Sequence, residues 1–252
     1  MRKRILLTIL AVLVFKTVFV IVLIILIPEK IIAPWPSLSP DFEIKQLNAS
    51  CLVFSPNGKH IAIANMDGWD VVDFQTREIV ATYRGKKDYV SQICFSPDGK
   101  KLLTTNEYNN IILWDIESKQ VLFRLDDIDF CRSSGFSSDG TKIIAAIGGV
   151  FSKTGYAGIW NIETGKPEII FPTGCSQVDY APDEKSVILA HYNQIERWDV
   201  ETGKKINNIT VLEGRLDDYH FLSDGKQIMV AFPMLGNAIL IDIESERILN
   251  EF

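Results

Sequence analysis

Two places in the chain bring together residue types that could do chemistry. At one, Asp179 stands one residue before the aromatic Tyr180. At the other, His220 stands one residue before Phe221, and Asp218 lies two residues before His220. Carboxylate and imidazole groups bind metal ions, or act as general acid and base, when a fold brings them together. Single polar residues on the wall of a water-filled channel would give the same pattern, so both interpretations stay open.

Other catalytic and cofactor signatures are absent from the sequence. The chain has three histidines and contains no H-E-x-x-H, G-x-S-x-G or G-x-x-x-x-G-K motif. Its four cysteines lack the C-x-x-C spacing of a zinc site. Cys131 and Cys175 each stand five residues before an aromatic residue, where Val90 and Leu216 stand elsewhere, so we interpret them as small buried residues. We therefore expect no metal, no cofactor and no enzymatic activity.

A surface for a partner is the stronger prediction. The glycine-rich segment 148–158 contains Phe151 and Tyr156. Insertions in repeat proteins gather on one face and often bind partners. Acidic residues occur in connections expected on the same face, at Asp126, Asp127, Asp129, Asp217 and Asp218. The alternative interpretation is an acidic rim that is merely solvated.

The composition limits the classes of partner. The chain has 252 residues, 26 Lys and Arg against 32 Asp and Glu, and a net charge of -6. Residues 1–28 hold four of the basic residues and no acidic one, which leaves 22 against 32, or -10, for the rest. Such a charge makes electrostatic binding to nucleic acid unfavourable.

The elements that would position these residues are revealed by a repeat. Five turn segments follow one another in steps of 41, 41, 44 and 41 residues: Phe54–Gly58, Phe95–Gly99, Phe136–Gly140, Tyr180–Glu184 and Phe221–Gly225. A fixed period of this length is typical of architectures in which each unit buries its apolar face against its neighbours.

Each unit is predicted to contain four short strands. Sequences such as Ser-Pro-Asp-Gly favour a type I turn, with Pro in its second place and Gly in its fourth. After the turn comes a short β-branched run, too short for a helix, at 60–65, 101–105, 142–147, 186–191 and 227–232. A third strand, a polar hairpin and a fourth strand follow, for example at 111–115 and 121–125. The fold class is therefore all-β.

At this point the chain resembles the WD-repeat family of β-propellers. The name-giving dipeptide is present as Trp114-Asp115 and Trp198-Asp199, and nearly so as Trp160-Asn161. The resemblance implies a propeller of five four-stranded blades with the three tryptophans packed between blades. The family's Gly-His dipeptide is absent and its partner aspartate survives only in Asp67-Gly68, so we expect the family's hydrogen-bond network to be largely missing.

The number of blades leaves the closure of the ring open. Family members usually close with seven blades, and this chain supplies five, within the known range of propellers. We expect a closed ring in which either 42–47 or 246–252 completes the last blade. An open ring would expose strand edges and would require self-association or a partner that supplies blades.

The N-terminus has the features of a membrane anchor. Residues 5–27 form an apolar run with only three polar residues, longer than the roughly 20 residues that span a bilayer. A basic tip at 1–4 predicts a cytoplasmic N-terminus, and a Pro-rich linker at 28–41 leads to the propeller domain, 42–252. We expect a transmembrane signal-anchor helix with the propeller outside the cytoplasm.

The sequence predicts a membrane-anchored, non-catalytic propeller that serves as a protein–protein interaction module. Two alternatives remain. One is an extracytoplasmic propeller that binds a ligand or acts as an enzyme through its central channel, with Asp179 and His220 in the site. The other is a truncated copy of a longer propeller.

Overall fold

The computed structural model describes most of the chain from residue 49 onwards. The described residues are 49–85, 89–106, 110–126, 128, 130–148, 155–211, 216, 218–222, 225–232 and 237–251. The predicted basic tip (1–4), transmembrane helix (5–27), linker (28–41) and start of the propeller domain (42–48) lie outside them. Within these described ranges, no helix is long and apolar enough to cross a membrane.

The described residues form five four-stranded antiparallel sheets, one for each repeat, which we call blades 1 to 5. Blade 1 contains β1 (Ala49–Phe54), β2 (His60–Asn65), β3 (Gly68–Asp73) and β4 (Ile79–Arg84). Blade 2 contains β5 (Val90–Phe95), β6 (Lys101–Asn106), β7 (Asn110–Asp115) and β8 (Val121–Leu125). Blade 3 contains β9 (Cys131–Phe136), β10 (Lys142–Ile147), β11 (Tyr156–Asn161) and β12 (Pro167–Phe171). Blade 4 contains β13 (Gln177–Tyr180), β14 (Ser186–His191), β15 (Gln194–Asp199) and β16 (Lys205–Thr210). Blade 5 contains β17 (Asp218–Phe221), β18 (Gln227–Phe232), β19 (Asn237–Asp242) and β20 (Arg247–Glu251).

The predicted all-β class and the predicted strands are confirmed. The β-branched runs coincide with β2, β6, β10, β14 and β18, the second strand of each blade. The turns between first and second strands close as expected, because the amide of the fourth turn residue donates to the carbonyl of the first. Gly58 N lies 2.9 Å from Ser55 O, and Gly99 N lies 2.8 Å from Ser96 O. Each repeat therefore encodes its own hairpins locally.

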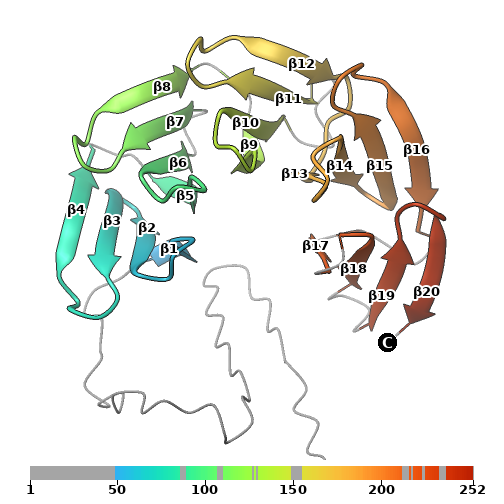
Figure 1. Cartoon of the computed structure of the whole chain (residues 1–252), viewed down its shortest axis with the longest axis horizontal. Helices are drawn as coiled ribbons and strands as arrows, with labels where there is room; N and C mark the ends of the chain where they lie inside the picture. The colour runs from blue at the N-terminus through green and yellow to red at the C-terminus, as the bar shows by residue number, and fades with distance from the viewer. Residues whose placement is uncertain are drawn as a thin grey trace, which may run out of the picture.

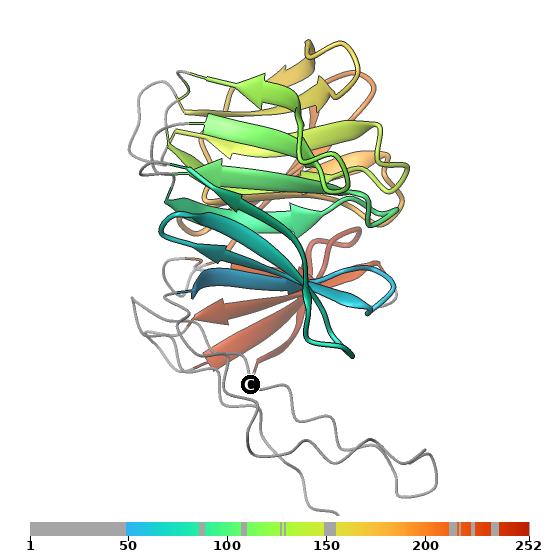
Figure 2. The same cartoon turned by 90° about the vertical axis from the view of Figure 1, so that its left-hand side faces the viewer.

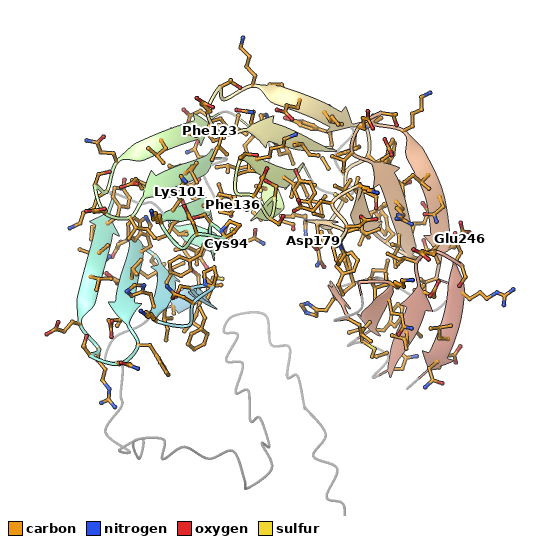
Figure 3. All side chains as sticks on the ribbon, in the orientation of Figure 1. Cys94, Lys101, Phe123, Phe136, Asp179 and Glu246 are labelled. Atoms are coloured by element: carbon orange, nitrogen blue, oxygen red, sulfur yellow. The ribbon has the colours of Figure 1, made fainter. Side chains whose placement is uncertain are left out.

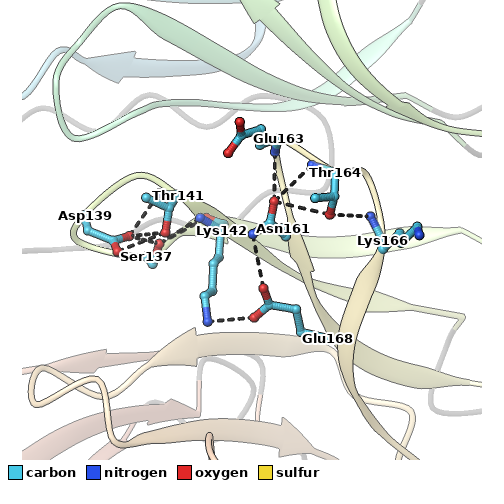
Figure 4. A network of polar contacts seen from close by, with 9 residues as sticks. All are labelled: Ser137, Asp139, Thr141, Lys142, Asn161, Glu163, Thr164, Lys166 and Glu168. Carbon is cyan, nitrogen blue, oxygen red and sulfur yellow. Dashed lines mark hydrogen bonds and ion pairs between the residues drawn. The ribbon is translucent and has the colours of Figure 1, made fainter.

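Polar side chains fix these turns, as Figure 4 shows for blade 3. Ser137 Oγ donates to Asp139 Oδ1 over 2.6 Å, and the same hydroxyl accepts the amide of Lys142 at 3.0 Å. Asp139 also accepts the amide of Thr141 at 2.9 Å. The hydrogen bond from Ser137, followed by the amide of Thr141, lowers the pKa of Asp139. The turn is thus stabilised by side chains of its own sequence.

The residue that follows the tryptophan of the repeat stabilises the next hairpin in the same way, by accepting hydrogen bonds from backbone amides. Asn161 Oδ1 accepts the amides of Glu163 and Thr164, each at 3.0 Å (Figure 4). Asp115 accepts the amide of Ser118 at 2.8 Å in blade 2, and this backbone hydrogen bond lowers the pKa of Asp115. The aspartate of the Trp-Asp dipeptide is therefore a turn-stabilising residue here.

The core lies between successive blades, where the three tryptophans are buried as predicted. Trp114, Trp160 and Trp198 are 4%, 3% and 7% exposed. Trp114 packs with residues of blades 1 and 2, including Trp69, at a ring-centroid distance of 5.7 Å. At each of the four junctions, a blade thus buries one of its faces against the next blade.

The five blades form an arc that does not close (Figure 1). Blades 1 and 5 stand at its two ends, and the view turned by 90° shows the sheets stacked along the arc (Figure 2). β20 pairs with β19 of its own blade, and β4 pairs with β3 of its own blade, so among the described residues no strand is shared between the ends. The expected closed ring is wrong for these residues, because the side chains packed at each junction set the turn between blades, and five blades stop short of a full circle.

Candidate functional site

The first strands of the blades line the middle of the arc and are tied to one another by side chains (Figure 1). Ser133 Oγ of β9 donates to the carbonyl of Val178 in β13 at 3.2 Å, and the amide of Val178 donates back at 3.3 Å. Gln177 makes the corresponding pair of bonds with Tyr219 of β17, at 3.0 and 3.2 Å. These bonds fix the spacing of residues that come from different blades.

A pocket of about 290 Å³ lies where these strands begin. Four blades contribute to its lining. The lining residues are Ser91 and Gln92 of blade 2, Phe130, Cys131 and Arg132 of blade 3, Ser176 before β13 and Leu216 before β17. The pocket therefore exists only because the blades are assembled.

Arg132 is the only charged side chain among the described residues that line this pocket. Its guanidinium carbon lies 5.4 Å from the ring centroid of Phe130, a cation–π contact that orients it. Its Nε is buried and has no hydrogen-bond partner among the described atoms. The part of the chain that the structure describes also provides no ion pair for this guanidinium, although Gln92 donates to the backbone carbonyl of Arg132.

The other polar side chains of the pocket already donate to backbone carbonyls, Gln92 to that of Arg132 and the two serines within their own blades. Ser176 Oγ donates to the carbonyl of Ala190 at 2.9 Å, and Ser91 Oγ lies 3.2 Å from the carbonyl of Thr105. Arg132 is left as the donor that can serve a ligand. A guanidinium binds carboxylate and phosphate groups through parallel N–H bonds, and a buried donor without a partner costs free energy until it finds one. The arrangement favours an anionic group in the pocket.

The structure places Asp179 and His220 at equivalent positions of neighbouring inner strands. Asp179 lies in β13 towards the middle of the arc, as Cys94 of β5 does (Figure 3), and it accepts a hydrogen bond of 2.9 Å from Gln177. His220 lies in β17, and Asp218 is the first residue of that strand. Among the described residues, no group of three or more His, Cys, Asp or Glu side chains could hold a metal ion.

The residues predicted for an interaction face are only partly described. Asp126 follows β8 and forms an exposed ion pair with Arg124. Tyr156 begins β11 and packs against the core between blades 2 and 3, with its ring 6.4 Å from that of Trp160. The side chain of Tyr156 is therefore partly buried. The other predicted residues, Phe151, Asp127, Asp129 and Asp217, lie outside the described residues.

The cysteines are free thiols, and the two predicted to be small buried residues are buried. Cys131 and Cys175 are 2% and 0% exposed. Burial raises the pKa of Cys131 to about 12 and also raises that of Cys175. The pKa of Cys94 is raised to about 12 for the same reason. Such thiols are poor nucleophiles, since the reactive form is the thiolate.

The buried carboxylate of Glu196, between blades 3 and 4, stabilises the fold through its contacts with neighbouring side chains. Glu196 is 3% exposed and accepts the indole N–H of Trp198 at 2.9 Å. Lys205 forms an ion pair with it, and His191 Nε2 lies 3.4 Å from its Oε1. Burial opposes its ionisation, but the contacts from His191, Lys205 and Trp198 outweigh burial and hold its pKa at about 2. In blade 2, Thr104 takes the same part and accepts the indole N–H of Trp114 at 2.8 Å.

Arg132 was missed by the sequence-based reasoning, although the repeat contains a signal for it. The position four residues before the first aromatic residue of each turn holds Ser50, Ser91, Arg132, Ser176 and Asp217. Among these five positions only one holds an arginine, and it stands out once Ser91, Arg132 and Ser176 are known to line a pocket. Its importance follows from the pocket and not from the residue type.

Comparisons with known proteins agree with this architecture. The model of the family described as WD domain, G-beta repeat matches residues 77–115, from two residues before β4 to the end of β7. The chain is 24% identical over 162 residues to Small ribosomal subunit protein RACK1 of Drosophila melanogaster, which covers 60% of this chain and 51% of that protein.

Two further relatives match shorter segments. Retinoblastoma-binding-like protein E of Dictyostelium discoideum is 33% identical over 85 residues, 32% of this chain and 16% of its own length. Retinoblastoma-binding protein homolog 5 of Caenorhabditis elegans is 32% identical over 84 residues, 33% of this chain and 18% of its own. The chain thus spans about half the length of the first relative and less than a fifth of the other two. Together with the repeated four-stranded blades, these matches support a WD-repeat family for this chain.

Proposed function

We propose that this protein is a non-catalytic protein-interaction module that binds an acidic segment of a partner protein in the pocket around Arg132. One observation carries the proposal: a guanidinium without an ion pair in the described chain stands in a pocket built by four blades. An acidic side chain would supply the missing partner, and the exposed ring of Phe130, 42% accessible, would offer it an apolar neighbour. The names of two relatives, Retinoblastoma-binding-like protein E and Retinoblastoma-binding protein homolog 5, refer to protein binding and support the proposal of a binding role.

We further propose that the N-terminal segment 5–27 holds the module at a membrane, with the propeller outside the cytoplasm. The support is the apolar run and the basic residues before it. Resistance to carbonate extraction, combined with digestion of the propeller by protease added from outside intact cells, is the expected result. Release by carbonate would contradict anchoring, and protection from the protease would contradict the orientation.

The binding proposal is tested with the purified full chain in detergent and a fluorescent hexaglutamate peptide as the probe. The peptide's anisotropy should rise on binding, and Arg132→Ala should weaken binding by about tenfold to a hundredfold, as expected when a charge-assisted hydrogen bond is lost. Arg132→Lys should restore part of it. Lys166→Ala, on an exposed hairpin of the same blade, is the control because it removes the same charge elsewhere.

Two outcomes would contradict the proposal. If Arg132→Ala and Lys166→Ala weaken binding equally, the peptide responds to net charge and not to the pocket. If the unmodified chain fails to bind the acidic peptide at moderate salt, which screens long-range repulsion by the chain's net negative charge more than a close contact in the pocket, the pocket has no such ligand.

A further inference from the structure

We propose that two copies of this chain dock head to tail, with blade 5 of one copy accepting blade 1 of the other. This interface is separate from the pocket around Arg132 and continues the stack of blades beyond the ends of the arc. We call the face of a blade that is turned to the preceding blade its leading face, and the opposite face its trailing face.

The leading face of blade 1 has no blade before it among the described residues. Leu52 and Phe54 are 50% and 51% exposed there. Their equivalents in blade 2, Ile93 and Phe95, are 5% and 8% exposed because they pack against blade 1. The surface left uncovered therefore consists of residues that the repeat normally buries.

The exposed part of this face is apolar around Leu52 and Phe54. Phe74, which is 37% exposed, contacts Phe54 edge to face at a centroid distance of 5.6 Å. Ile61 and Ile63 of the same face are already buried, at 6% and 1%. A docking partner would therefore cover the inner half of the face, around Leu52 and Phe54.

The trailing face of blade 5 is the matching half. Its residues Met229, Ala231, Ala238 and Leu240 are only partly buried, and burial alternates along β18 and β19. In blade 3 the equivalent residues are Ile144, Ala146, Ala157 and Ile159, and all four are at most 1% exposed because blade 4 covers them. The trailing faces of blades 3 and 5 thus share the same pattern, a large apolar residue, two alanines and a second large apolar residue. This pattern is covered by the next blade in blade 3 and is uncovered in blade 5.

The leading face of blade 1 likewise resembles that of blade 4. Asp70 and Glu196 occupy the same place, next to Ile63 and Leu189 in the adjacent strand. Each is buried, at 5% and 3%, and each pairs with a basic residue of the fourth strand: Arg84 Nη2 lies 2.7 Å from Asp70, and Lys205 pairs with Glu196. A junction between blade 5 and a second blade 1 would therefore share these features with the junction of blades 3 and 4, with Val72 in the place of Trp198.

A second copy is the occupant that fits these observations. Each copy carries both halves of the junction, in the register that four junctions within the chain already use. The contact is heterologous, since the two surfaces differ, so a growing chain of copies or a closed ring of copies results. Every copy inside such a chain, and every copy of a closed ring, would then have both end faces covered.

The test uses two variants of the full chain in detergent, analysed by light scattering on a size-exclusion column. Leu52→Lys with Phe54→Lys disables the leading face, and Met229→Lys with Leu240→Lys disables the trailing face. The unmodified chain should assemble as its concentration rises, and each variant alone should weaken assembly by at least about tenfold, as loss of central apolar contacts does. A mixture of the two variants retains one intact junction and should form a 1:1 complex that grows no further.

Matched controls separate docking from other causes. Val121→Lys with Ile206→Lys places the same charges on exposed outer strands, at positions 45% and 50% accessible, and should assemble like the unmodified chain. Association through the membrane segment would leave all variants alike and would overturn the proposal. So would a chain that stays monomeric at every concentration, which would mean that other residues of the same chain, or a different protein, cover these faces. If a lysine variant fails to melt cooperatively, Phe54→Ser and Leu240→Ser replace it, and unchanged assembly in both would refute the interface.

Discussion

Replacing Trp114 by Ala should remove a large part of the stability of the propeller. The side chain is 4% exposed and lies between blades 1 and 2, with its ring 5.7 Å from Trp69 and 4.3 Å from Tyr83. Truncating a large buried aromatic side chain costs about 3–5 kcal/mol. The indole N–H also donates to Thr104 at 2.8 Å, and losing that bond places the expected cost near the upper end of the range. A domain stable by about 5–15 kcal/mol would be visibly weakened.

Urea unfolding of the full chain in detergent, followed by circular dichroism, measures this loss. Thr104→Val keeps the volume of the side chain and removes the acceptor of the indole N–H together with the long 3.4 Å hydrogen bond from Thr104 to the carbonyl of Ile112, so it should cost about 1–3 kcal/mol. The double variant should cost less than the sum of the two single variants, because both remove the same bond. A loss below about 1 kcal/mol for Trp114→Ala would refute the burial of this residue between the blades.

Three further predictions concern backbone, charge and thiols. Gly68→Ala should destabilise the domain strongly, because at its φ of 144° an added Cβ would lie 2.1 Å from the carbonyl oxygen of Tyr83. Gly58→Ala, where an added Cβ would have nothing within 4 Å, should cost only about 1 kcal/mol, and thermal melts of the two variants compare them. Glu196→Gln should reduce the loss of stability on acidification. The pKa of Glu196 is about 2, below its ordinary 4.5, so the ionised group stabilises the fold fully above about pH 4.5 and progressively less towards pH 2. Urea midpoints of the variant and the unmodified chain at pH 5 and pH 2.5 test this. Cys131 should react with a maleimide only after unfolding, since it is 2% exposed. Peptide mapping locates the label, because Cys51 and Cys94 are more exposed, and fast labelling of Cys131 itself in the folded chain would contradict its burial.

The strands and turns could be predicted because each repeat encodes them within a few residues. The run 142–147 coincides with β10, and 121–125 coincides with β8. Alternation of apolar residues, turn residues and β-branched residues acts over distances of one hairpin, so a single sequence contains the whole signal. The burial of Trp160 followed for the same reason, since a recurring aromatic residue in a repeat faces its neighbouring repeat.

The expected hydrogen-bond network was less accessible to the sequence. The absence of the Gly-His dipeptide predicted only that the family's network would be largely missing, and it did not indicate that Thr104 and Glu196 accept the indole N–H groups of their blades. These acceptors lie on different strands relative to their tryptophans: Thr104 is in the adjacent strand, and Glu196 is two residues away in the same strand. A motif of fixed residue types at fixed spacing could not indicate that the buried indole N–H has a different acceptor, on a different strand, in each of the two blades.

The closure of the ring could not be predicted, because no local pattern distinguishes an end from an interior position. Val72 and Ile241 both stand where the other blades have tryptophan. Ile241 is nevertheless 0% exposed against blade 4, whereas Val72 lies on the leading face of blade 1. The difference arises from the sum of the angles between successive blades. Each angle is set by packing between residues about one repeat apart in the sequence, and small differences in each angle add up around the arc. The pocket around Arg132 could not be predicted for the same reason. The position of Arg132 in the repeat can be read from the sequence, but the pocket forms only when four blades stand at the angles that these junctions impose. In a repeat protein the sequence therefore predicts each unit, whereas binding surfaces arise from how the units meet, and the experiments on Arg132 and on the two end faces address that level of structure directly.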